Sequence, residues 1–268
     1  MKKLLLLLLS ISLFGFNSCE KNIPEAPGKI PGLGFTPGEI EIKKPFVLPE
    51  GINVVGDITG IGNPVAKNEL KPLLAYDSKS IVPKYGSGCV VRLRVPLLNT
   101  RNSPRTVFFP QGLIFKCIDR AYQHGLVCQI FWVTLEPNER RDVIFDVYCG
   151  NLDIPSPDED GKYQIWGVTS STVLWDLLKT IGWKKINYEM IFKLMEMGKG
   201  IQEGPSYDEI TQKIQTMVWN LTNNGIPIST EDRAFLNTIP EMELAERPIV
   251  DSNSQFPEYF EEFLVTEK

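Results

Sequence analysis

Two short segments contain residue types that could do acyl chemistry together, a thiol and a carboxamide. The first, VYCGN, places Cys149 directly after an aromatic residue at the end of an expected strand. The second, IQTMVWNLT, places Gln215 and Trp219 four residues apart in an expected helix. Because residues at this spacing lie one turn apart on nearly the same helix face, we expect Trp219 to pack next to Gln215.

Together the two segments resemble the thioester domains of Gram-positive surface adhesins, which carry an aromatic-Cys block followed by a Gln-x-x-aliphatic-Trp block. In that family the Cys thiol is joined to the Gln side-chain carbonyl with release of ammonia, and an amine on a host surface can capture the acyl group. The resemblance covers only these two blocks, and it implies a bond between Cys149 and Gln215. A thioester is a better acyl donor than an amide, and burial would keep water away until a nucleophile arrives.

Disulfide bonds are the alternative use of the cysteines. The chain has 5 Cys, and the four that remain when Cys19 is set aside form an even set, which in an exported protein is usually paired. Three connectivities are open among these four residues, which are Cys89, Cys117, Cys128 and Cys149. In this alternative Gln215 is a helix-surface amide and Trp219 packs between the sheet and the helices. A thioester at Cys149 would instead leave an odd set of three.

The N-terminus has the features of an export signal. A positively charged start precedes a short apolar run from 4 to 16, which is below the ~20 residues that a membrane-spanning helix needs. Ser18-Cys19 follows, and here the chain resembles a bacterial lipoprotein signal of the Bacteroidetes type, although Asn17 departs from the usual lipobox. This resemblance implies lipidation of Cys19 and, with Glu20 next to it, an outer-membrane lipoprotein that faces the periplasm or the cell surface. The alternative is an ordinary signal peptide in which Cys19 has no role.

No other combination of residues predicts a catalytic or metal site. The chain has 1 His, His124, which we expect at a loop tip, and it has neither a Cys-x-x-Cys pair for zinc nor a Gly-x-Ser-x-Gly elbow for a triad. Residues 158–160 are acidic, but their spacing does not match an EF-hand loop. A glycan hydrolase would need a defined pair of carboxylates, and no pair stands out. We therefore predict that the protein is not an enzyme and holds no metal or cofactor.

The composition favours a folded protein that does not bind nucleic acid. Hydrophobic residues make up 43% of the 268 residues, which is enough for a sizeable core. The formal net charge is −5 and no basic stripe is visible, whereas nucleic-acid binding depends on Lys and Arg side chains that neutralise phosphates.

The expected fold is mainly β with some α, with an antiparallel, Ig-like β-sandwich over residues 39–168. Apolar and polar residues alternate in CVVRLRVPLL, in LVCQIFWVTLEP and in ERRDVIFDVYC, as in strands with one buried face. We expect the last two of these strands to pair across a turn at Pro137-Asn138. The loop LEPNE, residues 135–139, resembles a loop of bacterial immunoglobulin-like modules, and short strands at this spacing favour a sandwich or a barrel.

Helical patterns follow the expected sandwich. STVLWDLLKTIG, NYEMIFKLMEMG and STEDRAFLNTIP have helical features, and SYDEITQKIQTMVWNLTNNG has the strongest pattern, with a capping box formed by Ser206 and Glu209. The expected organisation is a signal peptide (1–18), a Pro/Gly-rich tether (19–38), the sandwich (39–168), a helical region packed on it (169–240) and an acidic tail (241–268).

The expected function is that of a non-enzymatic binding or scaffolding module of the cell envelope. The lipid would attach the protein to the membrane, and its ligand would be an extracytoplasmic protein or glycan. A more specific alternative is a thioester-containing adhesin that uses Cys149 and Gln215, and a third alternative is a glycan-processing enzyme.

Overall fold

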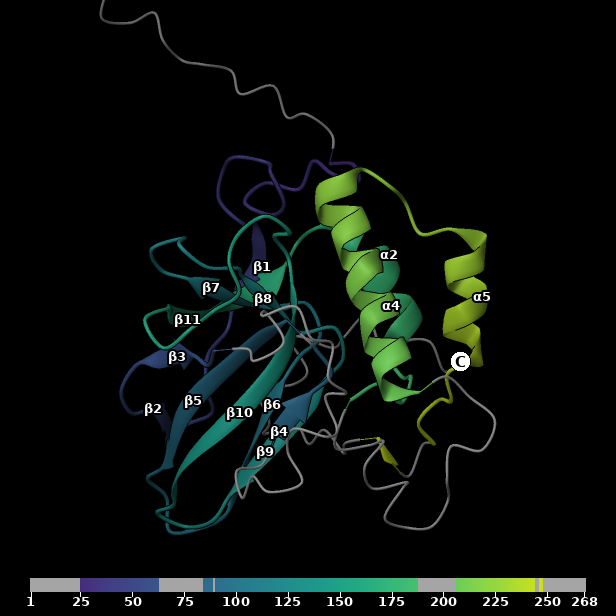
Figure 1. Ribbon diagram of the computed structural model, residues 1–268. Helices are drawn as coiled ribbons and strands as arrows, with labels where there is room; N and C mark the ends of the chain where they lie inside the picture. The colour runs from purple at the N-terminus through teal and green to yellow at the C-terminus, as the bar shows by residue number, and fades with distance from the viewer. Residues whose placement is uncertain (1–24, 63–83, 89, 188–205, 244–245, 248–268) are drawn as a thin grey trace, which may run out of the picture.

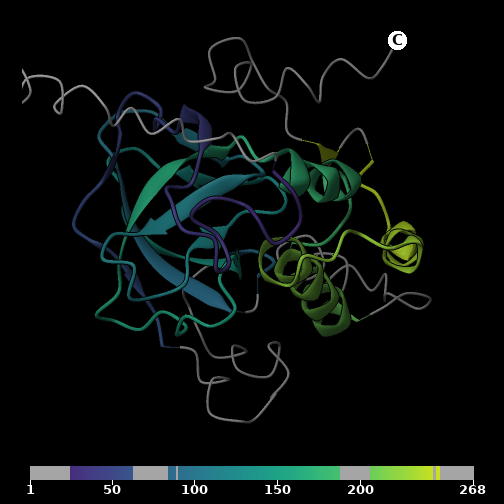
Figure 2. The same cartoon turned by 90° about the horizontal axis from the view of Figure 1, so that it is seen from above.

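The computed structural model describes residues 25–62, 84–88, 90–187, 206–243 and 246–247 of the 268-residue chain. In this described region the strands form a closed barrel, and the α-helices lie together on one side of it (Figures 1 and 2). The helix expected over 187–198 lies outside the described residues apart from its first position.

Six antiparallel strands close into the barrel. They follow one another around it as β5, β3, β11, β7, β8 and β10, and the pairing of β10 with β5 closes the ring. Their bounds are β3 (Ile58–Gly60), β5 (Val91–Asn99), β7 (Leu113–Cys117), β8 (Gly125–Leu126), β10 (Arg140–Cys149) and β11 (Lys162–Thr169). The closing ladder is continuous from Arg140 opposite Leu98 to Val147 opposite Val91.

The barrel shows that the expected Ig-like β-sandwich is wrong. In a sandwich two sheets face one another and keep free edges, whereas here β10 pairs with β5 and the main sheet returns on itself. Inward and outward residues alternate along the strands of both architectures, so the pattern in the sequence does not separate them. The broader prediction, mainly β with some α, is confirmed.

Further strands in the described region extend or cover the barrel. They are β1 (Ile42–Pro45), β2 (Ile52–Val54), β4 (Lys84–Gly86), β6 (Arg105–Phe109) and β9 (Phe131–Leu135). β1 pairs with β11, β2 pairs with β5, and β4 runs parallel to β10. β6 and β9 form a separate two-stranded sheet. The expected pairing of the two strands that flank Pro137-Asn138 is therefore wrong, because β9 pairs with β6 and β10 pairs with barrel strands.

Alternate residues of the strands fill the barrel interior. Phe145, Val147 and Cys149 occupy successive inward positions of β10, and all three are buried in one core cluster. The ring of Phe145 lies 4.7 Å from that of Phe109 and 4.8 Å from that of Phe131. The two-stranded sheet of β6 and β9 therefore contributes to the same core.

The helices cover outward-facing residues of the barrel. In the described region the α-helices are α2 (Thr172–Ile181), α4 (Tyr207–Trp219) and α5 (Thr230–Thr238), and α4 continues into the π-helical segment η3 (Asn220–Asn224). The predicted capping box of α4 is confirmed: the Glu209 N–H donates to Ser206 Oγ at 3.3 Å, and the Ser206 N–H donates to the Glu209 carboxylate at 2.7 Å. Apolar residues of α2 and α4 form a second core cluster with Tyr148, the β10 residue that points outward.

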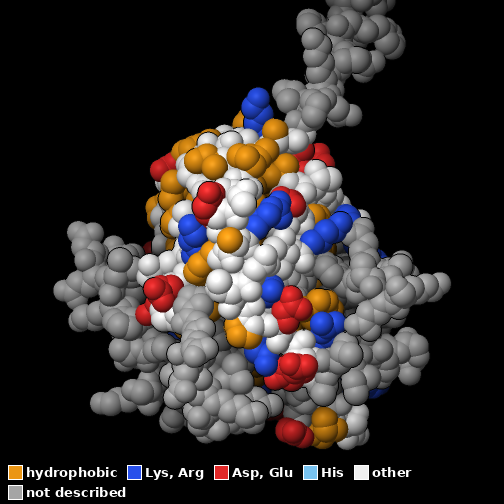
Figure 3. All heavy atoms as spheres, turned by 90° about the vertical axis from the view of Figure 1, so that its right-hand side faces the viewer, with side chains coloured by type: hydrophobic (Ala, Val, Ile, Leu, Met, Phe, Trp, Pro, Cys, Tyr) orange, Lys and Arg blue, Asp and Glu red, His pale blue; other side chains and the backbone are white. Residues whose placement is uncertain are grey.

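The helical side of the molecule shows a mixed surface. On the face that carries α5, acidic and basic side chains are interspersed, and hydrophobic side chains gather toward its upper end (Figure 3). None of the helices in the described residues combines the length and the hydrophobicity that crossing a bilayer would require.

Candidate functional site

Cys149 and Gln215, which are 66 residues apart in the sequence, are adjacent in the structure. The backbone N–H of Cys149 donates to Gln215 Oε1 at 2.8 Å, and Gln215 Nε2 donates to the backbone carbonyl of Cys149 at 2.9 Å. Cys149 is fully buried, and Gln215 is 1% exposed. The two hydrogen bonds hold the buried carboxamide against the backbone of the residue that carries the thiol.

The turn that follows β10 encloses the thiol of Cys149. The backbone N–H of Asn151 donates to Cys149 Sγ at 3.2 Å, and the thiol donates to the Asn151 carbonyl at 3.3 Å. Burial raises the pKa of the Cys149 thiol to about 12, while Trp219 and the Asn151 N–H act in the opposite direction. The thiol is therefore neutral at physiological pH, unlike the thiolate nucleophiles of cysteine enzymes. A thioester carries no charge, so burial does not disfavour it.

Helix α4 presents both residues of the Gln-x-x-x-Trp segment to β10. Gln215 and Trp219 lie one turn apart on nearly the same helix face. Gln215 bonds to Cys149, and Trp219 packs against the barrel cluster that contains Cys149. Ile214 and Val218, which lie next to them on the helix, are buried in the cluster between the helices and the barrel. Apolar packing therefore fixes the position from which Gln215 reaches Cys149.

Residues 25–40, here called the strap, pass over the end of the barrel and reach the end of α4 (Figure 1). The strap includes part of the segment that the sequence predicts to be a tether. Ile30, Leu33 and Ile40 are nevertheless each less than 5% exposed, and they belong to the core cluster formed with the helices. This part of the chain is thus packed on the domain.

The strap connects the two elements that carry Cys149 and Gln215. Gly34 bonds to the two residues that follow Cys149. Its N–H donates to the Gly150 carbonyl at 2.9 Å, and its carbonyl accepts from Asn151 Nδ2 at 3.3 Å. At the other end, the Gly28 N–H donates to the Leu221 carbonyl at 2.7 Å, just after α4. The strap therefore bridges the turn after β10 and the helix end that follows Gln215.

Gly34 is a point of close contact between the strap and η3. Its φ is +58°, a left-handed conformation that residues with a Cβ adopt at a cost. A Cβ at this position would lie 1.9 Å from the Thr222 carbonyl oxygen. Only glycine allows the strap to lie this close to the helix end.

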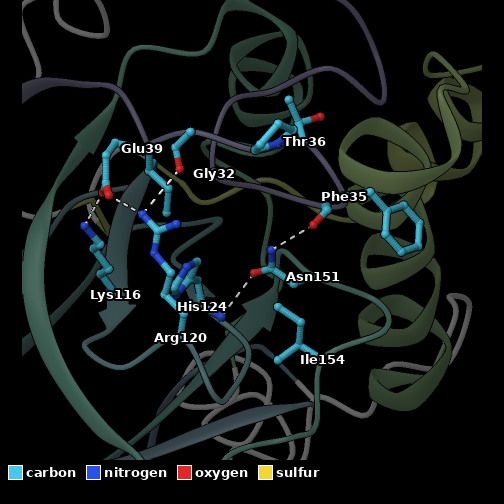
Figure 4. Close-up of a pocket in the computed structure, with 13 residues that line it drawn as sticks. Gly32, Phe35, Thr36, Glu39, Lys116, Arg120, His124, Asn151 and Ile154 are labelled. Atoms are coloured by element: carbon cyan, nitrogen blue, oxygen red, sulfur yellow. Dashed lines mark hydrogen bonds and ion pairs between the residues drawn. The ribbon is translucent and has the colours of Figure 1, made fainter.

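A cavity of about 140 Å³ opens between the strap, β7 and the turn at Asn151 (Figure 4). On its wall Glu39 accepts hydrogen bonds from Lys116 Nζ at 2.5 Å and from the Arg120 guanidinium. The bond from Lys116 is the main reason that the pKa of Glu39 is lowered. Asn151, whose backbone contacts the Cys149 sulfur, lines the same cavity. Asn151 therefore contacts both the cavity and the sulfur.

His124, which the sequence places at a loop tip, lies directly before β8, where it is buried and lines this cavity. Its Nδ1 accepts from the Cys117 N–H at 3.0 Å, and its backbone N–H donates to Asn151 Oδ1 at 3.2 Å. Burial, helped by the charges of Lys116 and Arg120, lowers the pKa of His124 to about 4. The imidazole therefore bonds to the end of β7, while the backbone N–H of His124 bonds to the turn at Asn151. In the described part of the chain, no three His, Cys, Asp or Glu side chains come together in a way that could hold a metal ion.

The described cysteines do not pair with one another. Cys117, Cys128 and Cys149 are free, buried thiols. Cys117 and Cys149 belong to the barrel cluster, whereas Cys128 lies in the cluster under the helices, and burial raises the pKa of the Cys117 and Cys128 thiols. No disulfide therefore links these three residues. Cys89 and the proposed lipidation residue Cys19 lie outside the described residues.

Asn151 and the strap are the parts of the site that the sequence patterns do not reveal. Asn151 stands two residues after Cys149 in the VYCGN segment, but its contact with the sulfur depends on the turn geometry. The Pro and Gly content of the strap predicts extended chain. The signal for packing was the set of apolar residues among them, Ile30, Leu33 and Ile40.

The site therefore combines a buried thiol, a carboxamide held against the same residue, a neighbouring indole and a strap that joins the two elements. Such an arrangement can hold a neutral acyl bond away from water. Comparisons of the chain with protein-family models, with curated proteins and with solved structures find no match.

Proposed function

We propose that the protein is a non-enzymatic binding module that captures its partner covalently, through a thioester between Cys149 Sγ and Gln215 Cδ. The observation that carries this proposal is the paired hydrogen bonding of the buried Gln215 carboxamide with Cys149, at 2.8 and 2.9 Å. Formation of the bond joins Sγ to Cδ and breaks the Cδ–Nε2 bond. Nε2 leaves as ammonia and takes the thiol proton.

The surroundings of the pair support storage of such a bond. Both residues are buried, and the strap and the Asn151 turn lie over them, which limits the access of water. A primary amine of the partner would attack Cδ, leaving an amide at Gln215 and a free thiol at Cys149. Each molecule reacts once, so this is capture and not catalytic turnover.

The proposal extends to the place where capture occurs. Lipidation of Cys19 would hold the module at the outer membrane, and the partner would be an extracytoplasmic protein or glycan that presents a primary amine. Part of the segment between Cys19 and the barrel is packed as the strap, so the anchor and the site would be joined by a short stretch of chain.

Intact mass measurement tests the proposal directly. The exported chain that begins at Glu20 would be measured unreduced, before and after incubation with methylamine. We expect a mass that is short by one ammonia, and methylamine added at Gln215 after incubation, as located by peptide mapping. The change Cys149→Ser should restore the full mass, whereas Cys117→Ser, another buried free cysteine, should leave the ammonia loss intact.

A chain with its full mass, or one that is short only by the hydrogens of disulfides, would contradict the proposal if methylamine also fails to add. The protein would then be a non-covalent binding module whose Cys149 is a structural residue.

A further inference from the structure

The indole N–H of Trp219 is a buried polar group without a hydrogen-bond partner of normal geometry among the described residues. Buried N–H groups without partners are costly and rare in native proteins. Trp219 follows Gln215 by one helical turn and packs against the cluster that contains Cys149, so its unsatisfied N–H belongs to the same site.

The Cys149 sulfur is the group on which Trp219 acts. Trp219 favours the thiolate form of Cys149, in opposition to the larger effect of burial. The sulfur already accepts a hydrogen bond from the Asn151 N–H at 3.2 Å. A neutral sulfur is a weak acceptor, whereas hydrogen bonds to an ionised acceptor are stronger. A hydrogen bond from the indole N–H to the sulfur would therefore be strongest when negative charge develops on the sulfur.

We propose that the Trp219 Nε1–H stabilises the Cys149 sulfur as it leaves, and that it thereby sets the rate at which the thioester opens. This inference rests on the proposed thioester. In the opening step the amine nitrogen bonds to Gln215 Cδ, and the Cδ–Sγ bond breaks with its electron pair going to Sγ. The proton lost by the amine ends on Sγ, which restores the neutral thiol.

The resting site explains why such donors would be needed. Because the buried site disfavours the thiolate, the Cys149 thiol on its own is a poor leaving group. Donors aimed at the place where charge develops lower that barrier and cost no reorganisation when the reaction occurs. Trp219 and Asn151 would supply two donors from two different elements, the helix and the turn after β10.

The change Trp219→Phe tests this role, since phenylalanine keeps an aromatic ring and removes the N–H. We expect the variant to form the thioester, seen as the loss of one ammonia, and to react with methylamine about 10- to 100-fold more slowly. Trp175→Phe is the matched control. Trp175 is a buried tryptophan of α2 whose Nε1 donates to the Thr169 carbonyl at 2.8 Å, and its replacement should leave the rate unchanged.

The sign of the effect separates a donor from a packing residue. If Trp219 only seals the site, Trp219→Phe loosens the packing, and both methylamine and water open the thioester faster. If the indole stabilises the leaving sulfur, both reactions slow by the same factor. An unchanged or faster rate in a variant that holds the thioester would overturn the inference and leave the thioester itself established. No ammonia loss in the unmodified protein would instead remove the proposed function and this inference with it.

A measurement on the unmodified protein covers the case in which the variant does not fold. In ¹⁵N-labelled protein the indole N–H resonance of Trp219 should move when methylamine opens the thioester, while that of Trp175 stays in place. A Trp219 resonance that does not respond would overturn the proposal.

Discussion

Strand β10 carries two buried polar contacts that are built in opposite ways. Near its middle, Asp146 accepts two hydrogen bonds from Arg92 of β5, at 2.6 and 3.0 Å. At its end, Cys149 meets the Gln215 carboxamide of α4. The first pair is charged and joins residues that lie directly opposite in the closing ladder of the barrel. The second pair is neutral and joins the barrel to the helices.

The difference teaches what burial does to each kind of pair. Two buried charges depend on each other, because removal of one leaves the other without compensation. Their role in the barrel is therefore structural. In the neutral pair, burial keeps the thiol protonated and excludes water, and both conditions suit a stored acyl bond. One strand thus contributes to barrel closure in its middle and to the candidate reactive site at its end.

We expect the largest effect from a variant that removes the Gln215 side chain and with it the neutral pair. Gln215→Ala should abolish methylamine incorporation and restore the full mass of the protein, because no acyl group remains. Gln212 is an exposed glutamine on the same helix, and Gln212→Ala should keep both the ammonia loss and the incorporation. Incorporation that persists in Gln215→Ala would place the reactive acyl group elsewhere.

Removal of one charge should have the next largest effect, on stability and not on capture. Asp146→Ala leaves Arg92 buried without its carboxylate and should lower the free energy of unfolding by about 3–5 kcal/mol. Denaturant titration measures the loss. Asp142→Ala, at an exposed position of the same strand, should change the stability by less than about 0.5 kcal/mol. Equal losses in the two variants would show that the charged pair has no special structural role.

Mild acid should lower the free energy of unfolding through protonation of His124, whose backbone bonds to the turn that follows Cys149. The pKa of His124 is about 4 in the folded protein and has an ordinary value of 6.5, so the unfolded chain takes up the proton first as the pH falls. The stabilisation is fully present above pH 6.5 and is lost between about pH 6.5 and 4, by up to about 3 kcal/mol. Unfolding titrations across this range should show the slope, which the matched variant His124→Gln should reduce. An identical slope in the variant would assign the pH dependence to groups other than His124.

The smallest expected effect on stability concerns the strap. In Gly34→Ala the left-handed conformation alone should cost about 1–2 kcal/mol, and the strap should lift from η3 because the added Cβ would collide with the Thr222 carbonyl. Methylamine should then react severalfold faster. No other described residue comes within 4 Å of the position of a Cβ at Gly62, so Gly62→Ala is the control that should change neither quantity. A rate that stays the same in Gly34→Ala would mean that the strap does not limit access to Cys149.

Local features of the fold were predictable because they depend on neighbours in the chain. The capping box of Ser206 and Glu209 and the four-residue spacing of Gln215 and Trp219 are properties of one helix, and the structure contains both. The alternation in β10 likewise predicts a set of residues on one face, and Val143, Phe145 and Val147 all belong to the barrel core. Each of these features follows from helical or strand periodicity alone.

Pairing between distant segments was less predictable. The strands on either side of Pro137-Asn138 have the pattern of a hairpin, yet β9 pairs with β6 and β10 closes the barrel with β5. Alternation states which residues point inward, and it is the same for a sandwich and a barrel. It does not state which strand is the neighbour.

The sequence by itself thus determined the helix that carries Gln215, the inward-facing strand that ends at Cys149 and the types of chemistry open to the two residues. Only the tertiary structure decided that these residues touch, that the Asn151 N–H bonds to the Cys149 sulfur and that a Pro/Gly-rich segment packs on the domain as the strap. The physical reason is the range of the interactions. Periodicity and capping act within one or two turns of chain, whereas the contact between Cys149 and Gln215 spans 66 residues and forms only when the barrel and the helices pack together.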